Sequence, residues 1–121
     1  MRAELKTLDS VDAPLGLASF TPEDPDNFAI EVAATVGSPD APGGDLFFFS
    51  VCTAAWLQSH GGAKGFVFLH GHLLVTRWNY EIVHRAISDL CRHTEGKDWD
   101  EVATALSRYG HWEFESYSGD I

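Results

Sequence analysis

The spacing of two histidines, His70 and His72, suggests that they could bind a metal ion. In an extended chain, side chains two positions apart point to the same side, so both imidazoles could bind one metal ion. A catalytic zinc site needs about three protein ligands and an open position. No spacing such as HExxH selects a third ligand here. The pair therefore has two interpretations: a small metal-dependent hydrolase, or histidines at the end of a strand.

Two glutamates near the C-terminus, Glu113 and Glu115, form a second candidate pair within "HWEFESY". Side chains at this spacing on a strand are roughly 7 Å apart, a separation that a catalytic carboxylate pair could use. Such chemistry requires one pKa raised by burial in an apolar pocket. Trp112 and Phe114 occupy the apolar side of the expected strand, so we expect the glutamates to face water. The pattern favours a final strand over an active site.

Nucleophilic and cofactor chemistry have less support in the sequence. Cys52 lies inside an apolar strand and Cys91 beside the apolar stripe of a helix, positions typical of packed free thiols, although one disulfide is the alternative. There is no GxSxG motif, and the glycines match neither phosphate-loop nor dinucleotide spacing. We therefore expect neither catalysis nor a bound cofactor.

The periodicity of apolar residues predicts the elements that position these side chains. Alternating patterns predict strands, and repeats of three and four predict helices. The expected strands cover residues 2–10, 28–36, 45–53, 64–78 (broken by Gly71) and 111–117, and the expected helices cover 54–60, 79–95 and 98–109. This order predicts one α+β domain over residues 1–121, a mainly antiparallel sheet with about three helices packed on it.

Capping residues and tryptophans refine this prediction. Thr53 is suited to begin the short helix, and Asp98 with Glu101 has capping-box spacing. Trp99 and Trp112 fall on core-facing positions. Trp78, which follows Arg77 at a junction before a helix, is either a core residue or a partly exposed anchor for a partner.

Charge is the clearest compositional signal, because eighteen acidic residues oppose eight basic ones and give a net charge of −10. Such a surface disfavours nucleic acid, since phosphate binding depends on Lys and Arg. A basic protein is a better partner, because opposite fields accelerate encounter. Solubility alone is the simpler explanation of the acidity. The sequence contains neither a signal peptide nor an apolar run of membrane-spanning length, so we expect a soluble cytoplasmic protein that does not bind membranes.

Several segments together resemble the Imm8 (immunity protein 8) family of bacterial polymorphic toxin systems. They are "MRAELKTLDS", "DPDNFAIEVAATVG", "VCTAAWLQSH", "NYEIVHRAISDLC" and "WDEVATALSRYGHWEFESY". The last of these is the most specific, and the resemblance spans nearly the whole chain. It implies a small α+β protein, encoded beside a toxin, that binds the toxin domain and protects the producing cell. It implies no catalysis and no cofactor.

This resemblance and the acidity together predict an immunity protein that neutralises a cognate toxin domain by stoichiometric binding. We expect the toxin to be basic, and a nuclease is a hypothesis from charge alone. The small metal-dependent hydrolase and a general protein-interaction module remain the alternatives. The candidate contact residues are acidic residues of loops and of faces expected to be exposed to solvent, together with one tryptophan: Glu23, Asp24, Asp26, Asp40, Trp78, Asp98, Asp100, Glu101, Glu113 and Glu115.

Overall fold

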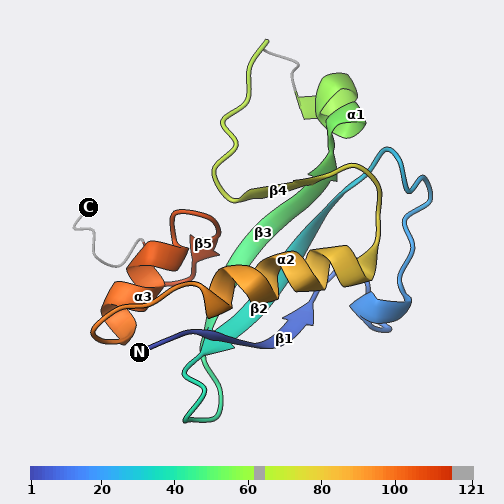
Figure 1. The fold of residues 1–121 in the computed structure, drawn as a ribbon. Coiled ribbons are helices and arrows are strands. Elements are labelled where there is room, and N and C mark those ends of the chain that lie inside the picture. Colours follow the sequence, from blue (N-terminus) through green and yellow to red (C-terminus); the bar gives the residue numbers. More distant parts are fainter. Residues whose placement is uncertain (62–64, 116–121) are drawn as a thin grey trace.

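A five-stranded sheet with helices packed on it forms the fold in the computed structural model, which describes residues 1–61 and 65–115 (Figure 1). The strands are β1 (Glu4–Asp9), β2 (Ala29–Gly37), β3 (Asp45–Thr53), β4 (His72–Val75) and β5 (His111–Trp112). The helices are α1 (Ala54–Trp56), α2 (Tyr80–Arg92) and α3 (Trp99–Leu106), with a 3₁₀ turn at Leu17–Ser19 and a π-helical turn at Leu57–Gly61. The predicted α+β class is confirmed.

The strands follow the order β1-β2-β3-β4, and β5 also pairs with β3. All pairs are antiparallel except β3 with β4, which is parallel. β4 pairs with the C-terminal end of β3, and β5 pairs with Phe47 and Phe48 near its other end. β3 is therefore the central strand, and its apolar residues on both sides suit this position.

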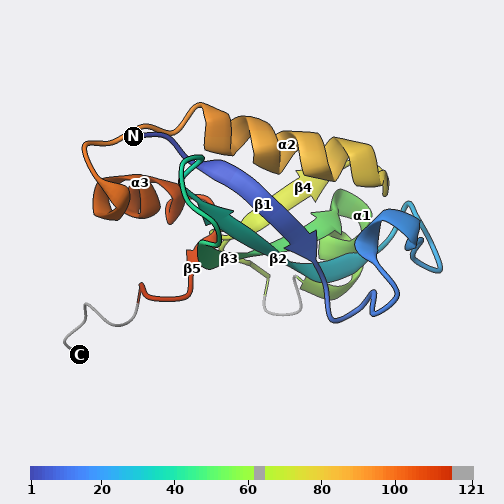
Figure 2. The same ribbon diagram turned by 90° about the horizontal axis from the view of Figure 1, so that it is seen from below.

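One face of the sheet forms the core. The alternating residues of β2 that were expected on one side are all buried, and Phe47, Phe49 and Val51 of β3 join them. Helix α2 lies along this face (Figure 2) and supplies Val83 and Ile87, both buried. Helix α3 adds a further buried stripe, formed by Val102, Ala103 and Leu106. Burial of this apolar area is the main stabilising term of the fold.

A register shift in β1 changes which residues of that strand face the core. The pairing with β2 is irregular between Leu5 and Thr7. Ala3 and Leu5 share the inward side, as predicted, but beyond the irregularity the buried residue is Leu8. A bulge of this kind inserts one residue and moves the following side chains to the opposite face.

The segment 64–78 differs from the predicted hairpin or bulged strand. Only His72–Val75 pairs, and it pairs with β3 rather than with the piece before Gly71. Gly71 has a φ of 79°, and its carbonyl accepts a hydrogen bond from the N–H of Ser50 at 2.7 Å. The chain therefore turns at Gly71 onto the edge of β3, because glycine adopts this left-handed conformation at little cost.

The predicted helix starts are confirmed. The Thr53 hydroxyl accepts from the N–H of Trp56 at 3.3 Å, and the Asp98 carboxylate accepts from the N–H of Glu101 at 2.9 Å. The Glu101 carboxylate in turn accepts from the N–H of Lys97 at 2.9 Å. Helix α2 ends at Arg92, four residues before the glycine expected to terminate it. No helix in residues 1–61 or 65–115 is both long and apolar enough to cross a membrane.

Both cysteines are free and buried, as predicted. Burial raises the pKa of the Cys91 thiol to about 12 and raises that of Cys52. At pH 8 a pKa near 12 leaves roughly one ten-thousandth of Cys91 as the reactive thiolate. We expect an aromatic disulfide reagent at pH 8 to modify the native protein at least ~100-fold more slowly than the unfolded chain, which exposes both thiols. Fast modification of one thiol in the folded protein would contradict this burial.

Candidate functional site

In the described part of the chain, the sheet face opposite α2 carries no helix along its length, apart from α1 and the turn after it at one end (Figure 2). We call it the uncovered face. Because side chains alternate along a strand, it is formed by residues of β2, β3 and β4 that lie between the core-facing ones. These residues are Ala29, Glu31, Ala33, Thr35, Leu46, Phe48, Ser50, Cys52, His72 and Leu74. Glu31 and Leu74 are exposed, Cys52 is buried, and the others are half-buried.

Two carboxylates on and beside this face are fixed by hydrogen bonds. Glu31 of β2 accepts a hydrogen bond from the hydroxyl of Ser50, its neighbour on β3. Asp12 accepts from the N–H of Glu31 at 3.2 Å, and its own N–H donates to the Ser10 hydroxyl at 3.1 Å. The Ser10 hydroxyl donates to the Glu31 carbonyl at 2.5 Å. The loop after β1 is therefore held on β2, and both carboxylates are positioned before any partner binds.

Two adjoining pockets open beside these carboxylates. The smaller, of about 200 Å³, is lined by Asp12, Ala29, Ile30, Glu31, Ser50, Cys52, Trp56 and His72. The larger, of about 510 Å³, shares Asp12, Ala29, Ile30 and Trp56 and extends over residues 20–24 and 27–28 to His60. Within the described ranges, the linings include four carboxylates and no Lys or Arg: Asp12, Glu23, Asp24 and Glu31. We call this pair the acidic pockets.

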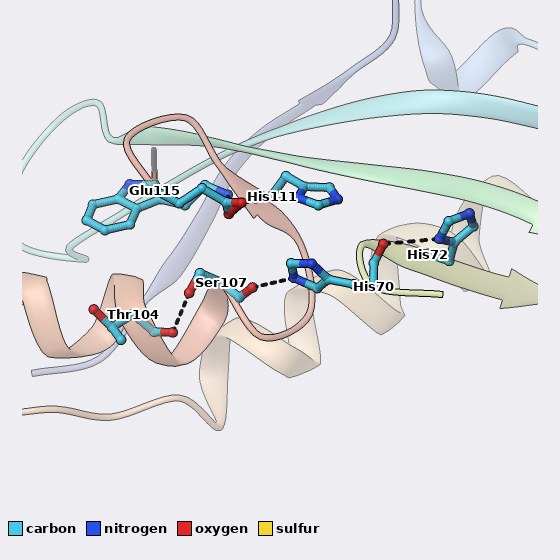
Figure 3. A network of polar contacts seen from close by, with 7 residues as sticks. His70, His72, Thr104, Ser107, His111 and Glu115 are labelled. Atoms are coloured by element: carbon cyan, nitrogen blue, oxygen red, sulfur yellow. Dashed lines mark hydrogen bonds and ion pairs between the residues drawn. The ribbon is translucent and has the colours of Figure 1, made fainter. Parts of the chain in front are cut away.

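The two histidines that suggested a metal site stabilise the fold instead (Figure 3). The Nε2–H of His70 donates to the carbonyl of Ser107 at 2.7 Å, and Nδ1–H of His72 donates to the carbonyl of His70 at 3.1 Å. The rings of His70 and His111 lie 4.4 Å apart, centre to centre, while the ring of His72 lies apart from both. In the described ranges, no three potential ligands among His, Cys, Asp and Glu gather in a group. Residues 1–61 and 65–115 therefore give His70 and His72 no third ligand in such a group.

The first predicted group of acids lies in the loop between β1 and β2. Glu23 and Asp24 line the larger acidic pocket. Asp24 also accepts a hydrogen bond from the N–H of Asp26 at 2.9 Å, and Asp26 pairs with Arg77 at 3.0 Å. Asp26 is therefore neutralised within the molecule, whereas Glu23 and Asp24 contribute negative charge to the pocket.

The second predicted group lies at the other end of the sheet. Asp98 and Glu101 are occupied at the start of α3, where they accept backbone N–H groups. Asp40 and Asp100 are exposed, Asp40 in the turn between β2 and β3 and Asp100 in the first turn of α3. The structure therefore separates the predicted acids into two groups rather than one continuous surface.

Glu113 and Glu115 also bind backbone groups. The Glu113 carboxylate accepts from the N–H of Leu46 at 2.7 Å, and the Glu115 carboxylate accepts from the N–H of Trp112 at 3.0 Å. Within the described residues 111–115, the predicted strand covers His111–Trp112 alone, because these side chains take the place of ladder partners and the chain turns back. Tyr117 lies outside the described residues.

Trp78 is a core residue, the first of its two predicted roles. It is 8% exposed, packs edge-on against Phe20 and Phe28, and donates its indole N–H to the carbonyl of Phe20 at 2.9 Å. We therefore leave it out of the contact surface. Because the N–H of Trp78 also donates to Pro25, it anchors the loop that carries Glu23 and Asp24.

The Imm8 family model, described as immunity protein 8, matches residues 3–117 of the chain. The chain belongs to the Imm8 family. No curated protein and no solved structure matches it.

Membership in this family implies that the chain neutralises a cognate toxin and does so without enzymatic activity. The resemblance drawn from its segments is confirmed, and so is the prediction that it is not an enzyme. The acidic pockets then become candidate contacts of an Imm8 protein with its toxin. The sequence alone did not predict the pocket residues Asp12, Glu31, Ser50 and Trp56 as contacts. The available signal was Glu31, a single charge within the otherwise apolar and small residues of β2.

Proposed function

We propose that this Imm8 protein neutralises its toxin by stoichiometric binding, and that the bound surface of the toxin is basic. The observation that supports this is the concentration of four carboxylates around two adjoining pockets whose described linings contain no Lys or Arg. The net charge of −10 extends the same field over the whole molecule.

A basic toxin would gain from this field in two ways. Opposite charges accelerate the diffusional encounter, and like charges penalise wrong partners. An acidic inhibitor is also suited to a nuclease, whose substrate channel must attract phosphate, because carboxylates placed in that channel exclude the nucleic acid. A nuclease toxin is therefore our proposal for the cognate partner.

Removing negative charge without touching the fold tests this proposal. Glu23, Asp40 and Asp100 are suitable because their carboxylates form no hydrogen bond or ion pair with the described part of the chain. We expect Glu23→Gln, Asp40→Asn and Asp100→Asn together to slow association with the toxin domain encoded beside this gene by about 3- to 10-fold at low salt. The dependence of the rate on salt concentration should flatten as well.

The matched control keeps the charge at the same three positions, with Glu23→Asp, Asp40→Glu and Asp100→Glu. Stopped-flow kinetics at several salt concentrations should give the wild-type rate for this control. An association rate that ignores both salt and the neutralising substitutions would show that the toxin is not recognised through its positive charge.

A further inference from the structure

We propose that the toxin docks on the uncovered face of the sheet, with one of its arginine or lysine side chains entering the smaller acidic pocket beside Glu31. This inference rests on the proposed function and adds the location of the interface and the side chain that it receives. The opposite surface, formed by the outer side of α2, is the competing location.

Charge distinguishes the two surfaces. The outer side of α2 carries bases as well as acids, including the exposed Arg85 and Arg92, and Arg92 pairs with Asp89 at 2.6 Å. The ten residues of the uncovered face include Glu31 and contain no Lys or Arg, and Lys6 of the neighbouring strand β1 is paired with Glu4 at 3.0 Å. A basic protein surface is therefore complementary to the uncovered face and would meet repulsion as well as attraction on α2.

Apolar residues distinguish them further. Leu74 of β4 is 52% exposed on the uncovered face. The segment leading into β4 exposes Phe66 and Phe68, at 61% and 82%, together with Val67 and Leu69. Its end is held in place, because the N–H of His72 donates to the carbonyl of Leu69 at 3.0 Å. Exposed apolar residues together with positioned carboxylates are typical of a protein interface, in which buried apolar contacts provide affinity and polar ones provide specificity.

The smaller pocket has the features that bind a long basic side chain. Glu31 and Asp12 supply carboxylates fixed by the hydrogen bonds of Ser50 and of the Glu31 backbone. Trp56 forms one wall, and its ring stacks on His60 with centroids 5.2 Å apart and an interplanar angle of 12°. A guanidinium group can pair with a carboxylate and pack on an aromatic face at the same time. Because both groups are held before binding, little further ordering opposes the interaction.

Two matched pairs of substitutions test this location. On the uncovered face, Glu31→Gln with Leu74→Ser removes the pocket charge and one exposed apolar contact. On α2, Glu81→Gln with Ile82→Ser removes the same groups, since Glu81 is exposed and Ile82 is 42% exposed. By calorimetry with the toxin domain encoded beside this gene, we expect at least ~100-fold weaker binding for the first variant and less than ~3-fold for the second.

Glu31 is hydrogen-bonded to Ser50, so its replacement can also affect folding. A second pair of variants therefore leaves Glu31 unchanged. Leu74→Arg changes only an exposed side chain and places a positive charge on the docking face, and Ile82→Arg is its counterpart on α2. We expect Leu74→Arg to weaken binding strongly at an unchanged melting temperature and Ile82→Arg to bind like the wild type. Equal effects on both surfaces, or a larger effect on α2, would overturn the proposed location while leaving stoichiometric inhibition intact. Failure of the wild-type protein to bind the toxin would instead overturn the proposed function.

Discussion

Replacing Asp45 by alanine is expected to destabilise the fold by about 2 to 4 kcal/mol, because one carboxylate oxygen accepts hydrogen bonds from two tryptophans. Oδ2 of Asp45 accepts the indole N–H of Trp99 at 2.8 Å and that of Trp112 at 3.0 Å. These residues come from β3, α3 and β5, so a single side chain joins three elements. Alanine would leave two half-buried N–H donors without an acceptor. Urea unfolding followed by tryptophan fluorescence measures the loss.

Two further variants separate the causes of this effect. Asp45→Asn retains a carbonyl oxygen that can accept both indoles, so we expect it to lose less than half as much stability as alanine. Asp40→Ala removes an exposed carboxylate from the neighbouring turn and should change the free energy of unfolding by less than ~0.5 kcal/mol. If Asp45→Ala matched Asp40→Ala, the two indole contacts would contribute nothing measurable.

Two adjacent glycines give the second large effect. A Cβ at Gly44 would lie 2.2 Å from the carbonyl oxygen of Val36 and 2.8 Å from the backbone N of Gly37. Backbone atoms of a paired strand cannot move aside cheaply, so Gly44→Ala should open the β2–β3 connection and cost about 3 kcal/mol or more. Thermal and urea unfolding give the free energy directly.

Gly43 supplies the control for this effect. Its φ is 76°, and a Cβ there would have no neighbour within 4 Å. Gly43→Ala therefore carries only the cost of a left-handed alanine, about 1 kcal/mol. A larger loss at Gly43 than at Gly44 would mean that backbone conformation, rather than close approach, limits this turn.

The elements with strong periodicity were predictable from the sequence. The alternation in β2 and the helical stripes of α2 and α3 each describe a single buried face, and burial determines such elements. The local capping residues Thr53 and Asp98 also act as predicted, because a cap depends on neighbouring residues alone.

Features that depend on tertiary pairing were not predictable. The apolar run around Phe66 and Phe68 has strand composition. It has no place beside β3, because β4 and β5 already occupy that edge of the strand. The alternation of "HWEFESY" predicts a longer strand, yet the Glu113 and Glu115 carboxylates bind backbone N–H groups and end it. The two hydrogen bonds that Asp45 accepts come from tryptophans 54 and 67 positions away, so its neighbours in the sequence do not reveal them.

The sequence predicted the acidity of the candidate site but only some of the residues that form it. The acidity and the loop acids Glu23 and Asp24 followed from the sequence, and the structure adds Asp12 and Glu31 beside them. These four residues meet because the loop after β1 is held on β2 by Ser10. The number of charged residues can be read from the sequence. The hydrogen bonds that bring these four acids to one face form only in the folded chain.

We propose that this Imm8 protein inhibits its toxin by binding it, one molecule to one. The most direct test titrates purified wild-type protein into a fixed concentration of its cognate toxin domain and follows toxin activity. The result we predict is a linear fall in activity that reaches zero at one equivalent. Complete inhibition at a small fraction of an equivalent would indicate an enzyme, and full toxin activity at an excess of the protein would contradict the proposed inhibition.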